Sequence, residues 1–273
     1  MDLRVHNQGL ACLVTTSWDD GHPFDLRVAE RLAARGIAGT FYVPLRYDAI
    51  PRMSGVQIRR LRAMGMEIGS HTMSHLRLSE ASDETALREL LESRDALENM
   101  LGEPVTSFCY PEGKLRPGVA QLVRAAGYTL ARTTWAFRNR LAFDPLLMPV
   151  SMQLYAHSPA VLARHALLEG NMAGLFDWIT RLGRISDPPG LAGRMLSEIR
   201  RRGGVLHIWG HSWELENCGL WPLLDQVLDT IARQQGVEYL TNAGVLAAVH
   251  SRSENAVCGC LITTNPRHSS TPR

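Results

Sequence analysis

The chain has 273 residues, of which 45% are hydrophobic and 21% are charged, and its formal net charge is +2. This length suits one large α/β domain or two small ones, and it can bury a sizeable core without disulfide or metal staples. The mild charge argues against nucleic acid as a partner, because such binding would require a basic stripe.

Strand and helix patterns alternate through the first half of the chain. Runs rich in β-branched and aromatic residues predict strands at 10–18, 37–45, 66–72, 105–113 and 128–134. Amphipathic spacing predicts helices between them at 23–36, 54–65, 82–102 and 117–127. Ser54 is the expected cap of the second helix. Because the connections are short, the pattern predicts parallel βαβ units, either as an open sheet or as a (β/α) barrel.

The second half of the chain departs from this alternation. Residues 158–185 are helical and are interpreted as an insertion within the same domain, and 186–190 are interpreted as a loop. We predict a single domain over 1–250 and a flexible tail over 251–273. The N-terminal segment lacks the apolar run of a signal peptide, and no stretch is long enough to span a bilayer, so a cytoplasmic location is expected.

Polar residues gather where the predicted strands end. Asp19 and Asp20 follow the first strand, and His71 and His75 follow the third. His211 follows a late strand. In parallel α/β folds the carboxyl ends of the strands lie at one face, so these side chains are expected to meet there. The alternatives are that an aspartate caps the next helix, that the two histidines are surface residues on a helix, and that His211 is structural.

These residue types suit metal-assisted hydrolysis. Two neutral imidazoles four residues apart and one carboxylate are ligands for a divalent metal. Adjacent aspartates at a strand end can point in different directions, so one can bind the metal while the other acts as a base toward a metal-bound water. His211 is the expected general acid, because histidine is the usual proton donor near neutral pH. His207 lies in the middle of the same strand and is expected to be buried.

Four short motifs follow one another along the chain: SWDDG, HTMSH preceded by GMEIGS, the turn CYPEG, and LHIWGH in the late strand. In this order and separation they resemble the polysaccharide deacetylases, carbohydrate esterase family 4, also called the NodB homology domain. The resemblance covers roughly residues 10–250, and the first two motifs are its most specific part. It implies a distorted (β/α) barrel with about seven parallel strands.

The resemblance also implies a reaction: metal-dependent removal of an acetyl group, N-acetyl before O-acetyl, from an acetylated sugar, oligosaccharide or glycoconjugate. The enzyme class is a hydrolase of carbon–nitrogen bonds other than peptide bonds. By position, the implied catalytic groups are the base Asp19, the acid His211, and the backbone N–H of Glu112 as oxyanion donor. The implied metal ligands are Asp20, His71 and His75. Zinc is the implied ion, with cobalt, nickel or manganese as alternatives.

Two positions depart from the family pattern. The third motif of the family often begins with an arginine that pairs with the base, and Cys109 stands at that position. Arg132, at the end of the next strand, is the hypothesised source of that charge. Glu112 stands where the family often has tyrosine, and its carboxylate either favours a cationic or hydroxyl-rich substrate or points to solvent. The expected substrate-binding residues are Tyr110, Arg132 and Trp213.

The sequence leaves other functions open. A degenerate family member would bind carbohydrate without hydrolysing it, although the intact aspartate and histidine pairs argue against this. A non-haem iron oxygenase also uses two histidines and a carboxylate, but its carboxylate is expected close to the first histidine. A metal-free scaffold is a third alternative. The carrier of the sugar, whether nucleotide, lipid or soluble oligosaccharide, also stays open, and the insertion at 158–185 is a candidate determinant.

Overall fold

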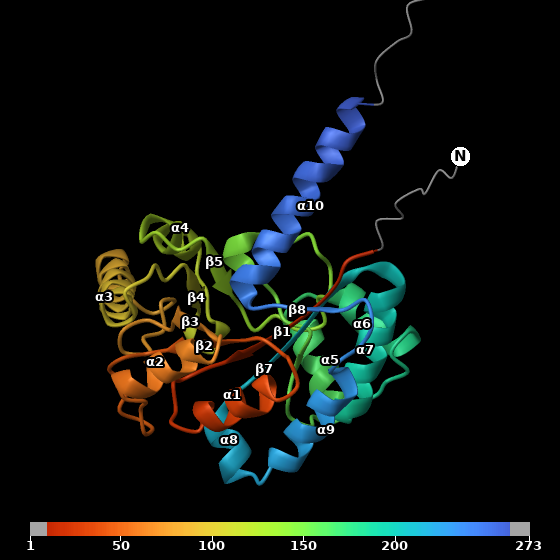
Figure 1. Cartoon of the computed structure of the whole chain (residues 1–273), viewed down its shortest axis with the longest axis horizontal. Helices are drawn as coiled ribbons and strands as arrows, with labels where there is room; N and C mark the ends of the chain where they lie inside the picture. Colours follow the sequence, from red (N-terminus) through yellow and green to blue (C-terminus); the bar gives the residue numbers. More distant parts are fainter. Residues whose placement is uncertain (1–9, 263–273) are drawn as a thin grey trace, which may run out of the picture.

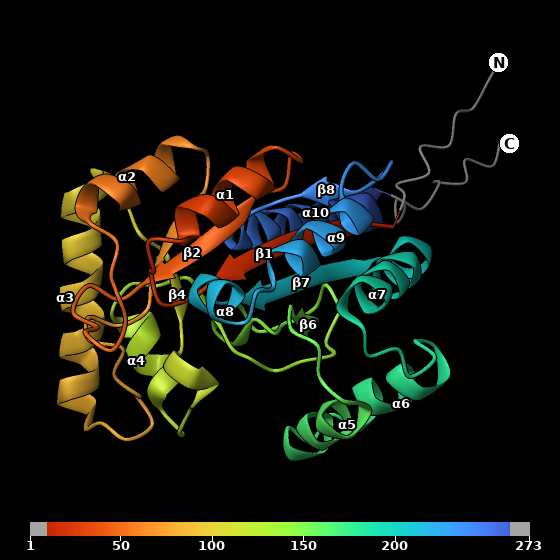
Figure 2. The same cartoon turned by 90° about the horizontal axis from the view of Figure 1, so that it is seen from below.

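A curled sheet of parallel strands forms the centre of the molecule in the computed structural model, which describes the backbone of residues 10–262 and the side chains of 10–252. Seven strands follow the order β5-β4-β3-β2-β1-β7-β6, and β8 pairs with the first half of β1 (Figure 2). The strands are β1 (Cys12–Trp18), β2 (Gly39–Val43), β3 (Glu67–Ser70), β4 (Ser107–Cys109), β5 (Leu130–Arg132), β6 (Met152–Gln153), β7 (Gly204–Gly210) and β8 (Glu238–Tyr239). The predicted distorted (β/α) barrel is confirmed.

The curl of the sheet comes from the chain between β5 and β7. The amide of Met148 donates to the carbonyl of Ala131 beside β5, and the amide of Ser151 donates to the carbonyl of His207 in β7. This segment therefore bonds to β5, at one end of the sheet, and to β7, near the other end. The strand ends of β1, β3, β4, β5 and β7 are thereby turned toward one face.

Helices cover the outside of the curled sheet, and α5 and α6 stand together at one edge (Figures 1 and 2). The helices are α1 (Asp25–Ala33), α2 (Gly55–Ala63), α3 (Asp83–Leu101), α4 (Val119–Ala125), α5 (Pro159–Leu168), α6 (Met172–Thr180), α7 (Pro188–Arg202), α8 (Ser212–Asn217), α9 (Trp221–Ile231) and α10 (Asn242–Ile262). Two short 3₁₀ turns are η1 (Pro111–Gly113) and η2 (Pro145–Leu147). The predicted cap is confirmed, because the Ser54 side chain accepts a hydrogen bond from the amide of Gln57.

The central strand β1 is buried along its whole length, as expected for a parallel strand covered on both faces. Its polar side chains are satisfied inside the core. The Thr15 hydroxyl donates to Asn242 Oδ1 at 2.8 Å, and Ser17 Oγ lies 2.9 Å from His207 Nε2. Asn242 also donates to the Tyr42 hydroxyl, so the start of α10 is fixed against the sheet.

One expectation needs correction. Residues 186–190 are not a loop, because the Asp187 side chain caps α7 and the helix begins at Pro188. The backbone of α10 continues to Ile262 and residues 263–273 lie outside the described part, so the flexible tail at 251–273 stays a prediction. The predicted insertion is helical, as α5 and α6. In the described part of the chain, none of the helices has the length and apolar character needed to cross a bilayer.

Candidate active site

The two adjacent aspartates at the end of β1 point to different surroundings. The amide of Asp19 still donates to the Gly210 carbonyl, so Asp19 continues the pairing of β1 with β7. Asp20 then adopts a φ of 76°, in the left-handed region that asparagine and aspartate tolerate best. Gly21 follows with a φ of 62°, and a Cβ there would lie 2.8 Å from Val43 Cγ1. The turn therefore requires this glycine and sends the second carboxylate away from the first.

His71 and His75 come together through a tight turn after β3. Thr72 and His75 both have a φ of 59°, so the turn is not helical and the two histidines do not share the face of a helix. His71 is almost fully buried, which excludes the alternative of two surface histidines. The Glu89 carboxylate of α3 fixes the turn by accepting hydrogen bonds from the amides of Met73 and Ser74, each at 2.9 Å.

The imidazoles of this turn face one oxygen of Asp20. Asp20 Oδ1 lies 3.6 Å from His71 Nε2 and 3.3 Å from His75 Nε2. That oxygen is buried and accepts no hydrogen bond from the described side chains or backbone. His71 Nδ1 lies 2.8 Å from the Cys109 carbonyl, which can only accept, so Nδ1 carries the proton and Nε2 keeps its lone pair. An orphaned carboxylate oxygen and two imidazole lone pairs fit a divalent cation.

A second group of possible ligands is less suitable. Asp19, His71 and Cys109 also place three ligand atoms near one another. However, Asp19 is already paired with Arg132. Burial raises the pKa of the Cys109 thiol well above its usual value, which keeps it a protonated thiol and a poor ligand. The candidate metal site is therefore Asp20, His71 and His75, the predicted set.

Arg132 reaches Asp19 from β5, as hypothesised from the sequence. Its guanidinium forms a hydrogen-bonded ion pair with Asp19 Oδ1, and both side chains are buried. Burial acts to raise the pKa of Asp19, but Arg132 outweighs this and the pKa is lowered. The guanidinium lies over the rings of Tyr42 and Trp209, at 5.4 and 5.0 Å. Arg132 is fully buried and contacts Asp19, so it is not placed to contact a substrate, which corrects its assignment as a substrate-binding residue.

His211 follows β7 and approaches the other side of Asp20. Its Nε2 lies 3.8 Å from Asp20 Oδ2, which also accepts a hydrogen bond from the Trp213 indole at 2.9 Å. His211 Nδ1 lies 2.7 Å from Glu214 Oε2. Burial acts to lower the pKa of His211, but Glu214 and the two aspartates outweigh it and the pKa is raised. The Tyr155 hydroxyl bonds to both the amide and the carbonyl of His211 and so fixes its backbone.

The sequence did not indicate Glu89, Glu214 or Tyr155. Glu214 stands three residues after His211, a spacing that brings two side chains together in the first turn of α8. That spacing is the only signal in the sequence. Glu89 and Tyr155 come from elements far along the chain, so only the fold places them at the site.

Other predicted residues lie in the core. Tyr110 is fully buried, and its hydroxyl donates to the Leu146 carbonyl, so its side chain does not line the cavity and its assignment to substrate binding is corrected. Trp18, the aromatic residue of the SWDDG motif, is also fully buried. His207 lies between Ser17 and the Pro149 carbonyl, at 2.9 and 3.1 Å, as expected for a buried structural histidine.

A cavity of about 550 Å³ opens over these groups. Asp19, Asp20 and His211 line its floor, and Trp213 and Trp209 line it as well. The hairpin of α5 and α6 forms part of its wall. The hairpin contributes four side chains to the lining of the cavity: Leu162, His165, Leu168 and Glu169.

Glu112 stands at the rim of this cavity. Its φ of 56° turns the backbone sharply after β4, and its side chain is exposed. The carboxylate forms an ion pair with Arg77 at the surface, and both side chains are exposed, as in the alternative in which Glu112 points to solvent. The oxyanion role of its N–H stays a prediction.

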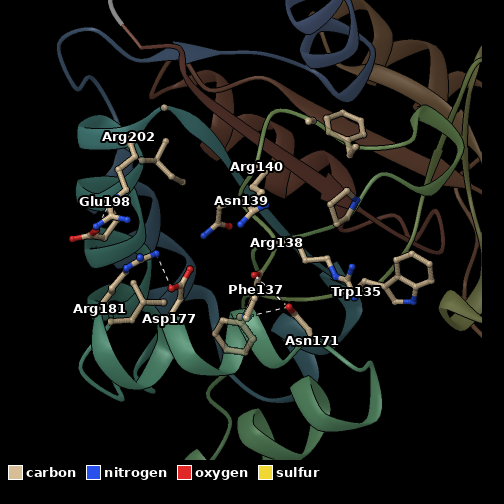
Figure 3. A pocket seen from close by; sticks show the side chains of 18 of the residues that line it. Trp135, Phe137, Arg138, Asn139, Arg140, Asn171, Asp177, Arg181, Glu198 and Arg202 are labelled. Carbon is tan, nitrogen blue, oxygen red and sulfur yellow. Dashed lines mark hydrogen bonds and ion pairs between the residues drawn. The ribbon is translucent and has the colours of Figure 1, made fainter.

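Phe137, Asn139 and Arg140 belong to the lining of a second cavity, which has a volume of about 750 Å³ (Figure 3). Phe137 lines both cavities. None of the predicted catalytic or metal-binding residues lines the second cavity. Its polar lining includes the ion pair of Arg181 with Asp177 at 2.7 Å and that of Arg202 with Glu198 at 3.4 Å. It is therefore not the candidate active site.

The first half of the chain matches a known protein family in sequence. The polysaccharide deacetylase family model matches residues 9–131, which contain Asp19, Asp20, His71 and His75. The peptidoglycan-N-acetylglucosamine deacetylase of Bacillus cereus is 27% identical over 126 residues. The match covers 45% of this chain and 57% of that protein, so the chain spans little more than half the length of this relative.

Solved structures share the fold over most of the chain. Their sequence identities of 16–18% are low, so this similarity shows the fold alone. A Mycobacterium smegmatis protein assigned to the polysaccharide deacetylases has a TM-score of 0.64 at 16% identity, over 98% of this chain and 96% of its own. The chitin deacetylase of Colletotrichum lindemuthianum has a TM-score of 0.57 at 16% identity, over 86% and 88%. The family 4 acetyl xylan esterase of Clostridium thermocellum, solved with cobalt, has a TM-score of 0.53 at 18% identity, over 89% and 92%. The chain is therefore similar to the polysaccharide deacetylases in sequence over residues 9–131 and in fold over most of its length.

Proposed function

We propose that this chain is a metal-dependent deacetylase that hydrolyses an acetyl group, N-linked before O-linked, from a sugar or glycoconjugate. The observation that carries the proposal is the division of labour between two consecutive carboxylates. Asp20 Oδ1 is an orphaned buried acceptor facing two imidazole nitrogens, whereas Asp19 is paired with Arg132. Asp20 is therefore suited to bind a cation, and Asp19 is suited to accept a proton.

Asp20, His71 and His75 would hold the cation, and zinc is the proposed ion because it accepts nitrogen and carboxylate ligands together. When bound, such an ion supplies Lewis-acid chemistry, polarising an acyl oxygen and lowering the pKa of water. The proposed substrate is an acetylated sugar in the cavity above these groups. The cytoplasmic location expected from the N-terminal sequence and the division of the chain into one domain and a tail stay predictions.

The protein groups account for both proton transfers. Asp19 takes a proton from the attacking water, whose oxygen forms a bond to the acetyl carbon. Its lowered pKa keeps it ionised and ready to accept. As the carbon–nitrogen bond breaks, His211 gives its proton to the departing amine nitrogen. Its raised pKa keeps that proton available at neutral pH, and Glu214 holds the ring in place through Nδ1.

The proposal is tested by measuring acetate release from a panel of N-acetylated and O-acetylated sugars by the zinc-loaded protein. Asp19→Asn should abolish release, because an amide cannot accept the proton. Asp48→Asn, at an exposed aspartate that does not line the cavity, should leave release unchanged. Equal rates for Asp19→Asn and wild type would contradict the assigned base. A protein that binds the metal and the sugar without releasing acetate would favour the binding-only alternative.

A further inference from the structure

The hairpin formed by α5 and α6, residues 159–185, presents an apolar face to solvent. Among the described side chains, eight large apolar ones are exposed, and five of these lie on this hairpin. They are Leu167, Leu168, Met172, Phe176 and Ile179. The last three recur at helical spacing on one side of α6. Single exposed apolar residues are ordinary in a folded protein, whereas a gathered set marks an interaction surface.

Exposed arginines that form no ion pair within the described residues lie on the same hairpin as this apolar face. Arg164 on α5 and Arg184 after α6 are exposed and form no ion pair with any side chain of 10–252. Arg140, which is exposed and lines the second cavity together with residues of α6, likewise has no ion pair within those residues (Figure 3). Of the two carboxylates of the hairpin, Asp177 pairs with Arg181, and Glu169 is partly buried and lines the active-site cavity on the other side. The free charge around the apolar face is therefore positive.

The opposite side of the hairpin is part of the active-site wall. Leu162 and His165 turn inward and line the catalytic cavity. Leu168 belongs to both surfaces, because it lines the cavity and is 71% exposed. The apolar face therefore begins at the mouth of the cavity, and whatever covers that face lies next to the entry of the substrate.

We propose that the hairpin rests on an anionic lipid surface and that the substrate is an acetylated sugar carried on a membrane lipid. This substrate class rests on the proposed deacetylase function. Apolar side chains flanked by arginines bind at the boundary between lipid headgroups and acyl chains without crossing the bilayer. The sugar then enters the cavity past Leu168 while its lipid stays in the membrane. A second copy of the chain suits this face less well, because a twofold contact would bring unpaired arginines together.

Co-sedimentation of the full chain with lipid vesicles tests the surface. We expect binding to vesicles containing phosphatidylglycerol, weaker binding to pure phosphatidylcholine, and loss with added salt. Met172→Ser combined with Phe176→Ser should weaken binding about tenfold or more, because both side chains are exposed and neither lines the catalytic cavity. Arg164→Glu combined with Arg184→Glu should remove the preference for phosphatidylglycerol. The matched control is Val56→Ser on α2, 69% exposed, which should bind like wild type.

Acetate release tests the substrate class. The Met172→Ser/Phe176→Ser variant should lose activity on an acetylated sugar anchored in vesicles and keep wild-type activity on a short soluble acetylated sugar. Equal vesicle binding by this variant, Val56→Ser and wild type would overturn the proposal. So would a wild-type dimer, measured by light scattering, that the same variant dissociates. Vesicle binding lost in the variant, with no acetate released from either substrate by wild type, would support the lipid surface and overturn the deacetylase function alone.

Discussion

Asp19 and Asp20 are consecutive in the chain, yet each faces a different set of neighbours. The left-handed turn at Asp20 and Gly21 separates them, and Val43 leaves no room for a side chain at the glycine. Asp19 stays in line with the sheet and meets Arg132 from β5. Asp20 turns toward the histidines. The backbone conformation of two residues thus assigns two roles to chemically identical groups.

Replacing Arg132 with methionine should destabilise the fold and abolish acetate release. The variant leaves the buried carboxylate of Asp19 without its partner, which costs about 3–5 kcal/mol of unfolding free energy. Urea denaturation measures the loss. Arg60→Met removes an exposed ion pair with Glu30 and should cost no more than about 1 kcal/mol. An Arg132→Met variant as stable and active as wild type would contradict the role of this arginine.

Glu214→Gln should move the alkaline limb of the pH–rate profile to lower pH. Glu214 raises the pKa of His211, so its neutral replacement lets that pKa fall. The acid must be protonated to act, and activity is lost as the pH rises through its pKa. The measurement is kcat/KM against pH for both proteins. Glu216→Gln, a nearby exposed carboxylate on α8, is the control and should keep the wild-type limb. An unchanged alkaline limb in Glu214→Gln would contradict the assignment of His211 as the general acid whose pKa Glu214 raises.

At the scale of elements, the turn after β3 depends on α3. Glu89 helps to hold the turn that brings the His71 and His75 side chains together, because it accepts hydrogen bonds from two of its amides. Glu89→Ala should therefore weaken zinc binding about tenfold to a hundredfold, as expected when a residue supporting metal ligands is lost. Isothermal titration calorimetry measures the affinity. The control is Glu92→Ala, on the same helix but paired at the surface with Arg46, and it should bind zinc like wild type. Equal losses of zinc affinity in both variants would contradict the role of Glu89 in holding the turn.

Elements with a strong local pattern were predictable from the sequence, and elements set by tertiary contacts were not. The helix at 82–102 has an N-cap serine and a terminal glycine, and it matches α3. The two-residue strand β6 has no periodicity to detect, and it exists because it pairs with β7. The spacing of His71 and His75 suggested a helix, but the left-handed residues of that turn are held by a distant carboxylate.

At the scale of the whole molecule, His207 ties the central strands to the chain that closes the sheet. It bonds to Ser17 of β1 and to the Pro149 carbonyl. Burial lowers its pKa to about 3, below the value of about 6.5 in an unfolded chain. Between these values the unfolded state binds a proton that the folded state does not. This contribution to stability is therefore complete above about pH 6.5 and is lost as the pH falls.

The stability advantage of wild type over His207→Asn should therefore shrink on acidification. Between pH 7 and pH 5 the difference in unfolding free energy should fall by about 2 kcal/mol. Urea denaturation at several pH values, with a chelator present so that metal binding does not contribute, measures it. A difference that stays constant over this interval would show that His207 is not buried in its neutral form.

The identity of the site residues was more predictable than their contacts. The parallel alternation indicated that distant strand ends share one face, which placed the aspartates, the histidines of the turn and His211 together. Tyr110 was assigned to the cavity because its motif ends there, but its side chain points into the core. The pairing of Arg132 with Asp19 was a hypothesis from charge balance, and only the curl of the sheet shows that β5 comes close enough.

The most direct test of the central claim compares zinc content and acetate release in Asp19→Asn and Asp20→Asn, measured on the same preparations. The claim predicts that Asp20→Asn loses both the bound zinc and the acetate release. It predicts that Asp19→Asn keeps one zinc ion per chain and loses only the acetate release. Zinc lost from Asp19→Asn but retained by Asp20→Asn would contradict the division of roles between the two carboxylates.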